Sequence, residues 1–345
     1  MKIVFVRHSL LSRGGDKMVA AHASHLASCG HDVTIKTNLA KTVFEIDPRV
    51  RLEPLRFRGK VGTLVAATVE MYDADRVVAD IIPLACLLAI RNRRITVYFA
   101  QDYDESYYSS FLARFFIRLL YCWGLCFRRI PVIAVSEQLA ALLKRRFKAN
   151  VTTACNGVDS GIFFPDPSAE LISEKENRKA ILVLSRSDNR KGFDLAQEVI
   201  LKLKAASAIP FEIWSVGERA EGKFSGLRHR DFGYVDEPSL RRIMSSADVF
   251  LYPSRHEGLP LMPLEAFACR CPVVTTTAVT YATPLMNAMV SELEDVDSLL
   301  SQVSRVLMDE RLKETLLHNA YDYASEHSLV HCRLEFSERL LHVQS

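Results

Sequence analysis

Two glutamates eight residues apart stand at a predicted junction between a strand and a helix. Glu257 and Glu265 both follow the apolar run Val249–Tyr252. Pro260 and Pro263 fit the start of a helix, where a proline costs no hydrogen bond. Carboxylates at such a junction can accept hydrogen bonds from sugar hydroxyls. The alternative is two unrelated surface glutamates, but the apolar neighbours of Glu265 indicate a buried carboxylate, which needs a partner.

Two cations bracket a short turn after another predicted strand. Arg186 and Lys191 stand at the ends of a six-residue turn that follows Ala180–Leu184. Cations placed in this way can clamp a diphosphate from two sides. A helix beginning at Gly192 adds the partial positive charge of its N-terminus. The alternative is a solvated basic loop.

A glycine pair follows the first apolar run. Gly14 and Gly15 lie between the predicted strand Ile3–Val6 and a helix that ends at Gly30. Glycines there let the backbone approach a ligand, and the N–H groups of a helix N-terminus suit a phosphate or carboxylate. The pair does not form a GxGxxG motif, so a dinucleotide site is weakly supported and a plain loop remains the alternative.

The elements that must position these residues alternate between short β-branched runs and longer helical patterns in both halves of the chain. This alternation predicts an α/β protein with two Rossmann-like domains, 1–165 and 170–327, facing each other across a cleft. We expect a linker at Pro165–Pro167 and the charged residues 170–179, and a C-terminal helix at about 328–345 that can pack back on the first domain. The other predicted strands are Val33–Thr37, Arg76–Val78, Ile95–Phe99, Val132–Val135, Phe211–Val216 and Val273–Thr276, and the predicted helices are 83–91, 106–128, 137–147, about 261–269 and one capped by Asp236.

Composition excludes several classes of protein. The chain has 345 residues, of which 49% are hydrophobic, a globular average that excludes disordered and collagenous proteins. Its eight cysteines form no paired CxxC or zinc pattern and are expected to be buried free thiols. The net charge of +3 divides into +9 over residues 1–165 and −6 over residues 166–345. A basic first half suits an anionic lipid or ligand, or is a solvated surface, and no nucleic-acid partner is expected.

No segment is typical of a signal peptide or a transmembrane helix, which predicts a cytoplasmic protein that can work at the inner face of the membrane. The segment Phe111–Arg129 alternates apolar residues with Arg114 and Arg118. It favours an ordinary packed helix, and the alternative is a helix that docks peripherally on an anionic membrane.

The ordered motifs resemble those of the retaining glycosyltransferases of family 4, which have the two-domain GT-B architecture. The combination of Glu-x7-Glu with Arg…Lys-Gly is the specific part of the resemblance. The matching residues are Gly14-Gly15, Ser136, Asn156-Gly157-Val-Asp159 with Phe163 and Pro165, Arg186…Lys191-Gly192, Val216-Gly217-Glu218, Gly233-Tyr-Val235, Ala247–Ser254 and Glu257-x7-Glu265.

The resemblance implies a role for each matching residue, with a nucleoside-diphosphate sugar (dTDP-, UDP- or GDP-linked) as co-substrate and no other cofactor. Arg186 and Lys191 would bind the donor diphosphate and stabilise the leaving charge. Glu265 would bind the ribose, and Glu257 with the N–H groups of Gly258 and Leu259 would hold the sugar. The base would lie near Val216, Gly217 and Val235, and Gly14 and Gly15 would bring the first domain's backbone against the phosphates or the acceptor.

The chain departs from the family's pattern at three places, one of which is the absence of the Gly-rich segment that commonly follows the strand Val273–Thr276. The usual acidic residue after the glycine pair is Asp16, one place early, and a strand end that often carries His here reads Gln101-Asp102-Tyr103-Asp104-Glu105. This run resembles a subset associated with rhamnose transfer from dTDP-rhamnose. Asp102 could contact the sugar or the acceptor hydroxyl, and the alternative for it is helix capping. With Arg186 and Lys191 available for the diphosphate, no metal is expected.

The leading hypothesis is a retaining glycosyltransferase that acts on a glycan or lipid-linked acceptor in surface-polysaccharide biosynthesis. The alternatives are a nucleotide-sugar epimerase or an inverting transferase of the same architecture, and a non-catalytic nucleotide-sugar-binding protein.

Overall fold

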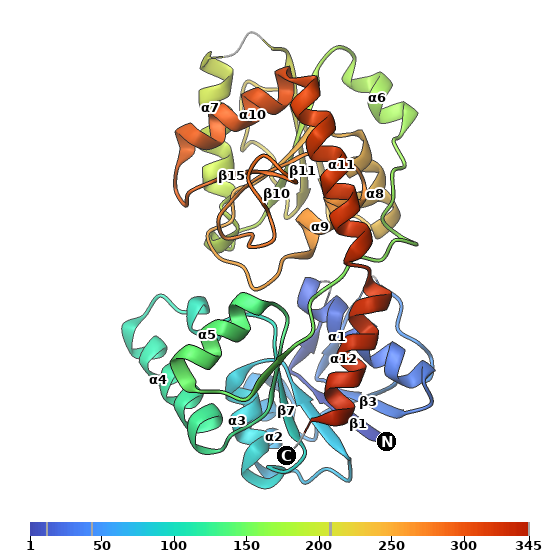
Figure 1. The fold of residues 1–345 in the computed structure, drawn as a ribbon, viewed down its shortest axis with the longest axis vertical. Coiled ribbons are helices and arrows are strands. Elements are labelled where there is room, and N and C mark those ends of the chain that lie inside the picture. Colours follow the sequence, from blue (N-terminus) through green and yellow to red (C-terminus); the bar gives the residue numbers. More distant parts are fainter. Residues whose placement is uncertain (12, 43, 207–208, 344–345) are drawn as a thin grey trace. The chain divides into compact units, whose positions relative to one another are not determined.

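The computed structural model describes residues 1–11, 13–42, 44–206 and 209–343. The chain divides into two compact units, Met1–Asn156 with Val330–Ser345 (unit 1) and Gly157–Leu329 (unit 2) (Figure 1). Of the C-terminal helix expected at about 328–345, Gln344 and Ser345 lie outside the described residues.

Unit 1 is built on a seven-stranded parallel sheet with the strand order β5-β3-β1-β6-β7-β8-β9. Its inner strands, such as β1 and β7, are mostly apolar because helices connect and cover them. The strands are β1 (Lys2–Val6), β3 (Asp32–Lys36), β5 (Arg51–Glu53), β6 (Arg76–Ala79), β7 (Thr96–Ala100), β8 (Val132–Ala134) and β9 (Val151–Thr153), with a separate pair β2 (Ser9–Leu10) and β4 (Leu39–Ala40). The helices are α1 (Gly14–Ser28), α2 (Gly59–Val69), α3 (Ile82–Arg91), α4 (Phe111–Tyr121), α5 (Glu137–Phe147) and the C-terminal α12 (Leu329–His342).

Unit 2 is built on a six-stranded parallel sheet with the order β12-β11-β10-β13-β14-β15. Its strands are β10 (Lys179–Ser185), β11 (Phe211–Gly217), β12 (His229–Gly233), β13 (Val249–Tyr252), β14 (Val273–Thr276) and β15 (Met289–Ser291). Its helices are α6 (Ala169–Lys175), α7 (Phe193–Ala206), α8 (Glu237–Ser246), α9 (Leu261–Ala268), α10 (Val296–Met308) and α11 (Glu310–Glu326).

The central strand β10 shows why both faces of this sheet are covered. Successive side chains of a strand point to opposite faces. Leu182 packs in one core with residues of α8, α9 and α11. Ile181 and Val183 pack in the other with residues of α7 and α10. An uninterrupted apolar strand is therefore the expected sequence for this position.

Several helix boundaries follow local signals in the sequence. Asp236 caps α8 by accepting a hydrogen bond from the N–H of Ser239 at 2.9 Å, as predicted. Ser136 caps α5 in the same way through the N–H of Leu139. Gly30 follows the end of α1 with a φ of +84°, which is the conformation that glycine supplies at a helix C-terminus.

Some expectations about elements were wrong. The charged residues 170–179, expected as a linker, begin with helix α6, because Ser168 caps it through the N–H of Leu171. The helix expected at 106–128 is broken into a 3₁₀ turn (Asp104–Tyr107), α4 and a π-helical turn (Cys122–Phe127). The C-terminal helix expected at about 328–345 is present as α12, and the helix α11 that precedes it was not expected separately.

The expectation of buried thiols was also only partly right. Cys86, Cys269, Cys271 and Cys332 are buried, but Cys29, Cys122 and Cys126 are exposed. The apolar neighbours of Cys122 and Cys126 do not bury these thiols, because the turn that carries them lies at the surface.

In the part of the chain that the structure describes, no helix is both long and apolar enough to cross a bilayer.

Helix α12 supplies part of the core of unit 1. The ring of Phe336 stacks on the imidazole of His22 in α1, with ring centroids 3.9 Å apart. Both side chains are fully buried, and Phe99 of β7 contacts both rings edge-on. Burial lowers the pKa of His22 to about 3, so this imidazole is neutral in the folded protein.

Candidate functional site

The turn between β10 and α7 holds its shape through its own side chains. The carboxylate of Asp188 accepts hydrogen bonds from the backbone N–H and the guanidinium of Arg190. Gly192 ends the turn with a φ of +67°, and a Cβ there would lie 1.9 Å from the carbonyl oxygen of Pro253. Glycine is therefore required at this position both by conformation and by the close approach of the neighbouring loop.

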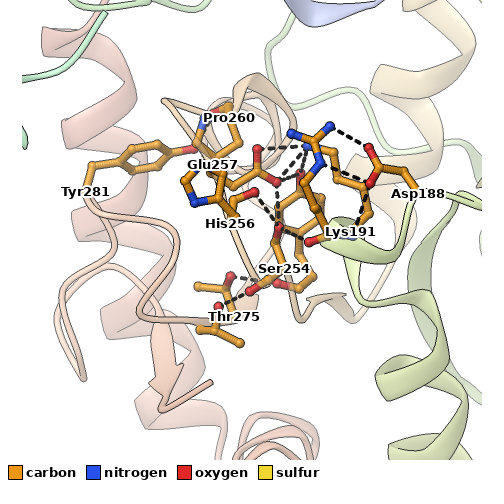
Figure 2. A network of polar contacts seen from close by, with 11 residues as sticks. Asp188, Lys191, Ser254, His256, Glu257, Pro260, Thr275 and Tyr281 are labelled. Carbon is orange, nitrogen blue, oxygen red and sulfur yellow. Dashed lines mark hydrogen bonds and ion pairs between the residues drawn. The ribbon is translucent and has the colours of Figure 1, made fainter. Parts of the chain in front are cut away.

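Lys191 and Glu257 meet at the carboxyl ends of β10 and β13 (Figure 2). Lys191 Nζ lies 2.8 Å from both carboxylate oxygens of Glu257. The hydroxyls of Tyr252 and Ser254 also donate to Glu257 Oε1, at 2.6 and 2.7 Å. The Glu257 side chain is only 6% exposed, so these donors satisfy a carboxylate that burial would otherwise destabilise.

Arg255 connects the loop after β13 to the turn after β10, the two segments that carry Glu257 and Lys191. Its backbone N–H donates to the carbonyl of Arg190 at 2.7 Å, and its guanidinium donates to the carbonyl of Asn189 at 2.7 Å. The same guanidinium forms ion pairs with Asp194 and Glu294. These hydrogen bonds lower the pKa of Asp194 and raise the pKa of Arg255. Sequence reasoning did not single out Arg255, because its partners are distant in the chain.

Arg186 lies on the other side of the turn, where it donates to the hydroxyl of Tyr234 at 2.9 Å. Burial raises the pKa of Tyr252 well above its ordinary value, the Glu257 carboxylate raises it further, and the charge of Arg186 opposes the rise. The charge of Arg186 thus reaches Tyr252, whose hydroxyl donates to Glu257. The structure brings both predicted cations to the same edge of the unit 2 sheet.

Glu265 lies in the second turn of α9 and is 5% exposed. Glu257 and Glu265 both lie close enough to Tyr281 to affect the pKa of its hydroxyl. This hydroxyl donates to the carbonyl of Pro260 at 2.6 Å. Burial raises the pKa of Tyr281 well above its ordinary value, and the carboxylates of Glu257 and Glu265 raise it further. Gly258 and Leu259 lie between the two glutamates at half-buried positions before α9.

The residues predicted to lie near a base occupy two neighbouring strand ends. Val216 is buried near the end of β11, and Gly217 follows it with a φ of +109°. A Cβ at Gly217 would lie 2.5 Å from the carbonyl of Ser185, which closes the end of β10 against β11. Val235 follows β12 and is half-buried.

In unit 1 the predicted glycine pair opens α1 next to a polar cluster. A Cβ at Gly15 would lie 2.7 Å from Gln101 Oε1, so the glycine admits this side chain. Gln101 donates to Asp80 at 3.2 Å, and Arg7 pairs with both Asp80 and Asp16. Burial raises the pKa of Asp16, and the charge of Arg7 opposes the rise. Gly14 is the first residue of α1.

Asp102 and Asp104 have different surroundings. Asp102 lies just after β7, is 9% exposed and accepts a hydrogen bond from the N–H of Tyr103 at 2.7 Å. Asp104 is buried and accepts from the N–H of Ile82 at the start of α3, and its burial raises its pKa well above the ordinary value. Asp102, Gly14 and Gly15 belong to unit 1, and the remaining predicted site residues belong to unit 2.

The arrangement in unit 2 suits an anionic, hydroxyl-bearing ligand. It joins two cations, a buried carboxylate with fixed orientation and a second buried carboxylate in the following helix. Cations bind phosphate oxygens, and oriented carboxylates accept hydrogen bonds from hydroxyls. Among the described residues, no group of three or more His, Cys, Asp and Glu side chains could hold a metal ion.

Comparisons with known proteins agree with this reading of unit 2. Residues 178–309 match the model of the family described as glycosyl transferases group 1. O-antigen chain mannosyltransferase B of Escherichia coli is 30% identical over 124 residues, covering 35% of this chain and 31% of that protein. Lipopolysaccharide glucosyltransferase WaaG of E. coli K12 is 24% identical over 165 residues, covering 45% and 44%. The chain thus spans less than half the length of these two relatives.

Solved structures extend the similarity in fold to both units. The crystal structure of WaaG, a glycosyltransferase involved in lipopolysaccharide biosynthesis, matches with a TM-score of 0.79 at 17% identity, covering 99% of this chain and 100% of that chain. Anabaena HepE in complex with UDP-glucose matches with a TM-score of 0.78 at 16% identity, with the same coverage. The resemblance to glycosyltransferases and the predicted fold class, GT-B with two Rossmann-like domains, are therefore confirmed.

Proposed function

We propose that this protein is a retaining glycosyltransferase that moves a sugar from a nucleoside-diphosphate sugar to a glycan or lipid-linked acceptor. Surface-polysaccharide or lipopolysaccharide biosynthesis at the cytoplasmic face of the membrane is the proposed setting. The match to glycosyl transferases group 1 supports it, because residues 178–309 carry Arg186, Lys191, Glu257 and Glu265. The two E. coli relatives are named for sugar transfer in O-antigen and lipopolysaccharide, and HepE binds UDP-glucose, which supports the same function.

The observation that carries the proposal is the pair of Lys191 and Glu257, with Arg186 on the other side of the turn. Arg186 and Lys191 would hold the diphosphate and stabilise the negative charge that develops when it leaves. The Lys191 ammonium, now directed at Glu257, would bridge this carboxylate and the phosphate. Glu257, with the N–H groups of Gly258 and Leu259, would then hold the sugar hydroxyls. Because two cations meet the diphosphate charge, activity is expected to survive EDTA.

The roles proposed for the other site residues follow from where these residues lie in the fold. Glu265 would accept hydrogen bonds from the ribose, since it lies one helix turn beyond the start of α9. Val216, Gly217 and Val235 would line the base at the ends of β11 and β12. Gly14, Gly15 and Asp102 of unit 1 are proposed to serve the donor phosphates, the sugar or the acceptor.

In the proposed reaction the bond between the anomeric carbon and the phosphate oxygen breaks as the acceptor oxygen bonds to the same face of the sugar. The departing phosphate oxygen takes the proton of the acceptor hydroxyl, which balances the step without a protein nucleophile. NMR of the product's anomeric configuration tests retention. An inverted anomer would instead favour the inverting transferase considered from the sequence.

A donor panel tests the substrate. Thermal shift and donor hydrolysis are measured with UDP-, GDP- and dTDP-sugars, dTDP-rhamnose among them. Selective stabilisation by dTDP-rhamnose would support the rhamnosyl subset that the run Gln101–Glu105 suggests. A response to GDP compounds alone would exclude it.

The central test compares Lys191→Ala and Glu265→Ala with Lys202→Ala. Lys202 is an exposed lysine of α7 that pairs with Asp297 and so controls for loss of a surface charge. Lys191→Ala is expected to lose at least about a hundredfold in turnover, as is typical when a group that stabilises the transition state is removed. Glu265→Ala is expected to lose turnover through weaker donor binding, while Lys202→Ala retains it. Full activity in both Lys191→Ala and Glu265→Ala would refute the proposal.

A further inference from the structure

Helix α4 and the turn after it present large apolar side chains to solvent. Phe111, Phe116 and Phe127 are 80%, 62% and 76% exposed. Leu112, Phe115 and Leu119 are 66%, 47% and 47% exposed. We call these six side chains the α4 apolar face. The sequence favoured an ordinary packed helix here, and that expectation was wrong, because the apolar stripe points away from the body of unit 1.

The spacing of these residues explains why one helix has two different sides. Successive helical residues are rotated by about 100°, so positions 111, 112, 115, 116 and 119 share one side. Ile117 and Tyr121 lie opposite and are buried. α4 lies at the outer edge of unit 1 (Figure 1). The helix therefore uses one side to attach to the unit and leaves the other uncovered in the described chain.

Arginines flank the α4 apolar face. Arg118 donates to Glu105 at 2.5 Å, and Arg114 approaches the same carboxylate at 3.4 Å. Burial opposes ionisation of Glu105, but the hydrogen bonds from Arg118 and Tyr103 hold its pKa below the ordinary value. Both arginine side chains remain 52% exposed, so one buried carboxylate fixes two cations at the surface.

The surrounding sequence adds to this positive charge. Residues 106–129 contain four arginines and no acidic residue. Arg129 is exposed, and Arg128 stacks over the ring of Trp123. The exposed Tyr107 and Tyr108 stand just before α4. Aromatic rings beside basic side chains are typical of segments that lie at the boundary between acyl chains and headgroups.

We propose that the α4 apolar face docks on an anionic phospholipid surface, with its phenylalanines among the acyl chains and Arg114, Arg118 and Arg129 at the phosphates. A lipid surface suits this face better than a second copy of the chain, because two identical faces would bring like charges together. This docking proposal rests on the proposed function, since binding to the lipid surface would bring the enzyme to a lipid-linked acceptor. Its test does not depend on catalysis.

The test is flotation with vesicles of phosphatidylcholine alone or with 30% phosphatidylglycerol, without donor or acceptor. The full chain is expected to float with the anionic vesicles and much less with phosphatidylcholine, and added salt should weaken binding. Phe111→Ser combined with Phe115→Ser and Phe116→Ser should weaken binding at least about tenfold, because this variant removes three of the six apolar side chains that would enter the acyl region. A matched control carries Ile172→Ser, Leu201→Ser and Met308→Ser, which alter exposed apolar residues of unit 2.

The control variant should bind as the unaltered chain does, and both variants should keep its unfolding temperature, because all six side chains are exposed. Equal flotation of the triple phenylalanine variant and the unaltered chain would overturn the proposal, as would no preference for anionic vesicles. A dimer in light scattering that the phenylalanine variant dissociates, without vesicle binding, would assign the face to a second copy instead. Soluble donor hydrolysis, measured in parallel, reports on the proposed function separately.

Discussion

Lys191 and Glu257 are 66 positions apart in the chain, yet the lysine ammonium lies 2.8 Å from both oxygens of the glutamate. The pair joins the loops after β10 and β13. A cation that could bind a phosphate is therefore held directly against a carboxylate that could bind a hydroxyl. Each group therefore competes with a ligand for the other group, so that a change in Glu257 is expected to alter what Lys191 binds.

Glu257→Gln should separate the binding of the nucleotide from catalysis. The carboxylate that competes for the Lys191 ammonium is neutralised, so UDP is expected to bind about threefold to tenfold more tightly. The sugar loses an ionised hydrogen-bond acceptor, so turnover is expected to fall at least about a hundredfold. Calorimetry with UDP and initial rates of donor turnover measure the two effects. Weaker UDP binding together with unchanged turnover would contradict the coupling.

Tyr252→Phe should weaken catalysis without unfolding the protein. Its hydroxyl donates to Glu257 Oε1 at 2.6 Å, so the phenylalanine leaves the carboxylate held only by Ser254 and Lys191. We expect kcat to fall about tenfold, which corresponds to ~1.4 kcal/mol of lost transition-state stabilisation. Tyr321→Phe, in helix α11, serves as the control, because Tyr321 has no contact with Glu257 among those that the structure describes. Equal rates for the two variants would show that Tyr252 does not position Glu257.

Gly192→Ala and Gly222→Ala should differ sharply in stability. Both glycines have a positive φ, but a Cβ at Gly222 meets no atom within 4 Å, whereas a Cβ at Gly192 collides with the Pro253 carbonyl. We expect Gly222→Ala to lower the free energy of unfolding by about 1–2 kcal/mol, the cost of the left-handed conformation. Gly192→Ala should lower it by at least about 3 kcal/mol, because the loop must also move. Urea unfolding measures both, and equal losses would count against the close approach.

The buried imidazole of His22 should make unit 1 sensitive to acid. Its pKa is lowered to about 3 in the folded chain, from the ordinary value of 6.5, by burial and by the nearby charges of Arg333 and His25. Between these two pH values the unfolded chain binds a proton that the folded chain does not. The free energy of unfolding therefore falls as the pH falls below 6.5, by ~1.4 kcal/mol per pH unit from this group.

His22→Leu removes this contribution and should flatten the dependence on pH between 6 and 4.5. Urea unfolding followed by the fluorescence of Trp123, the tryptophan of unit 1, measures it at several pH values. His318→Leu, at an exposed position of α11, should retain the dependence of the unaltered chain. An unchanged slope in His22→Leu would exclude His22 as its source.

The sequence was most informative where one local signal determines the structure. Strands such as Val249–Tyr252 were predicted because they are apolar on both faces, and α8 was predicted from the cap at Asp236. The short edge strands β5, β9, β12 and β15 were not predicted, since edge strands are less apolar and only their neighbours identify them. Helix α6 was missed because its charged sequence resembles a linker, although Ser168 caps it.

The candidate site was predictable as a set of residues but not as an arrangement. Motif spacing placed Arg186, Lys191 and Glu257 in the loops that follow strands, and Glu265 in the helix after the last of these loops, where the structure has them. It assigned Lys191 and Glu257 to different parts of a ligand and did not indicate that they pair with each other. The contributions of Tyr252, Ser254 and Arg255 depend on contacts between separate loops, which no local pattern contains. The outward direction of the α4 apolar face was likewise undetermined, because periodicity shows that a stripe exists but not which side is buried.

The position of α12 in unit 1 has a consequence for synthesis. The ribosome makes all of unit 2, Gly157–Leu329, before it reaches Phe336, whose ring covers His22. Domains usually complete their folding in the order of translation. Here the unit that begins first has to wait for the end of the chain, so unit 2 is expected to reach its native state while unit 1 still exposes the α1 surface that α12 later covers.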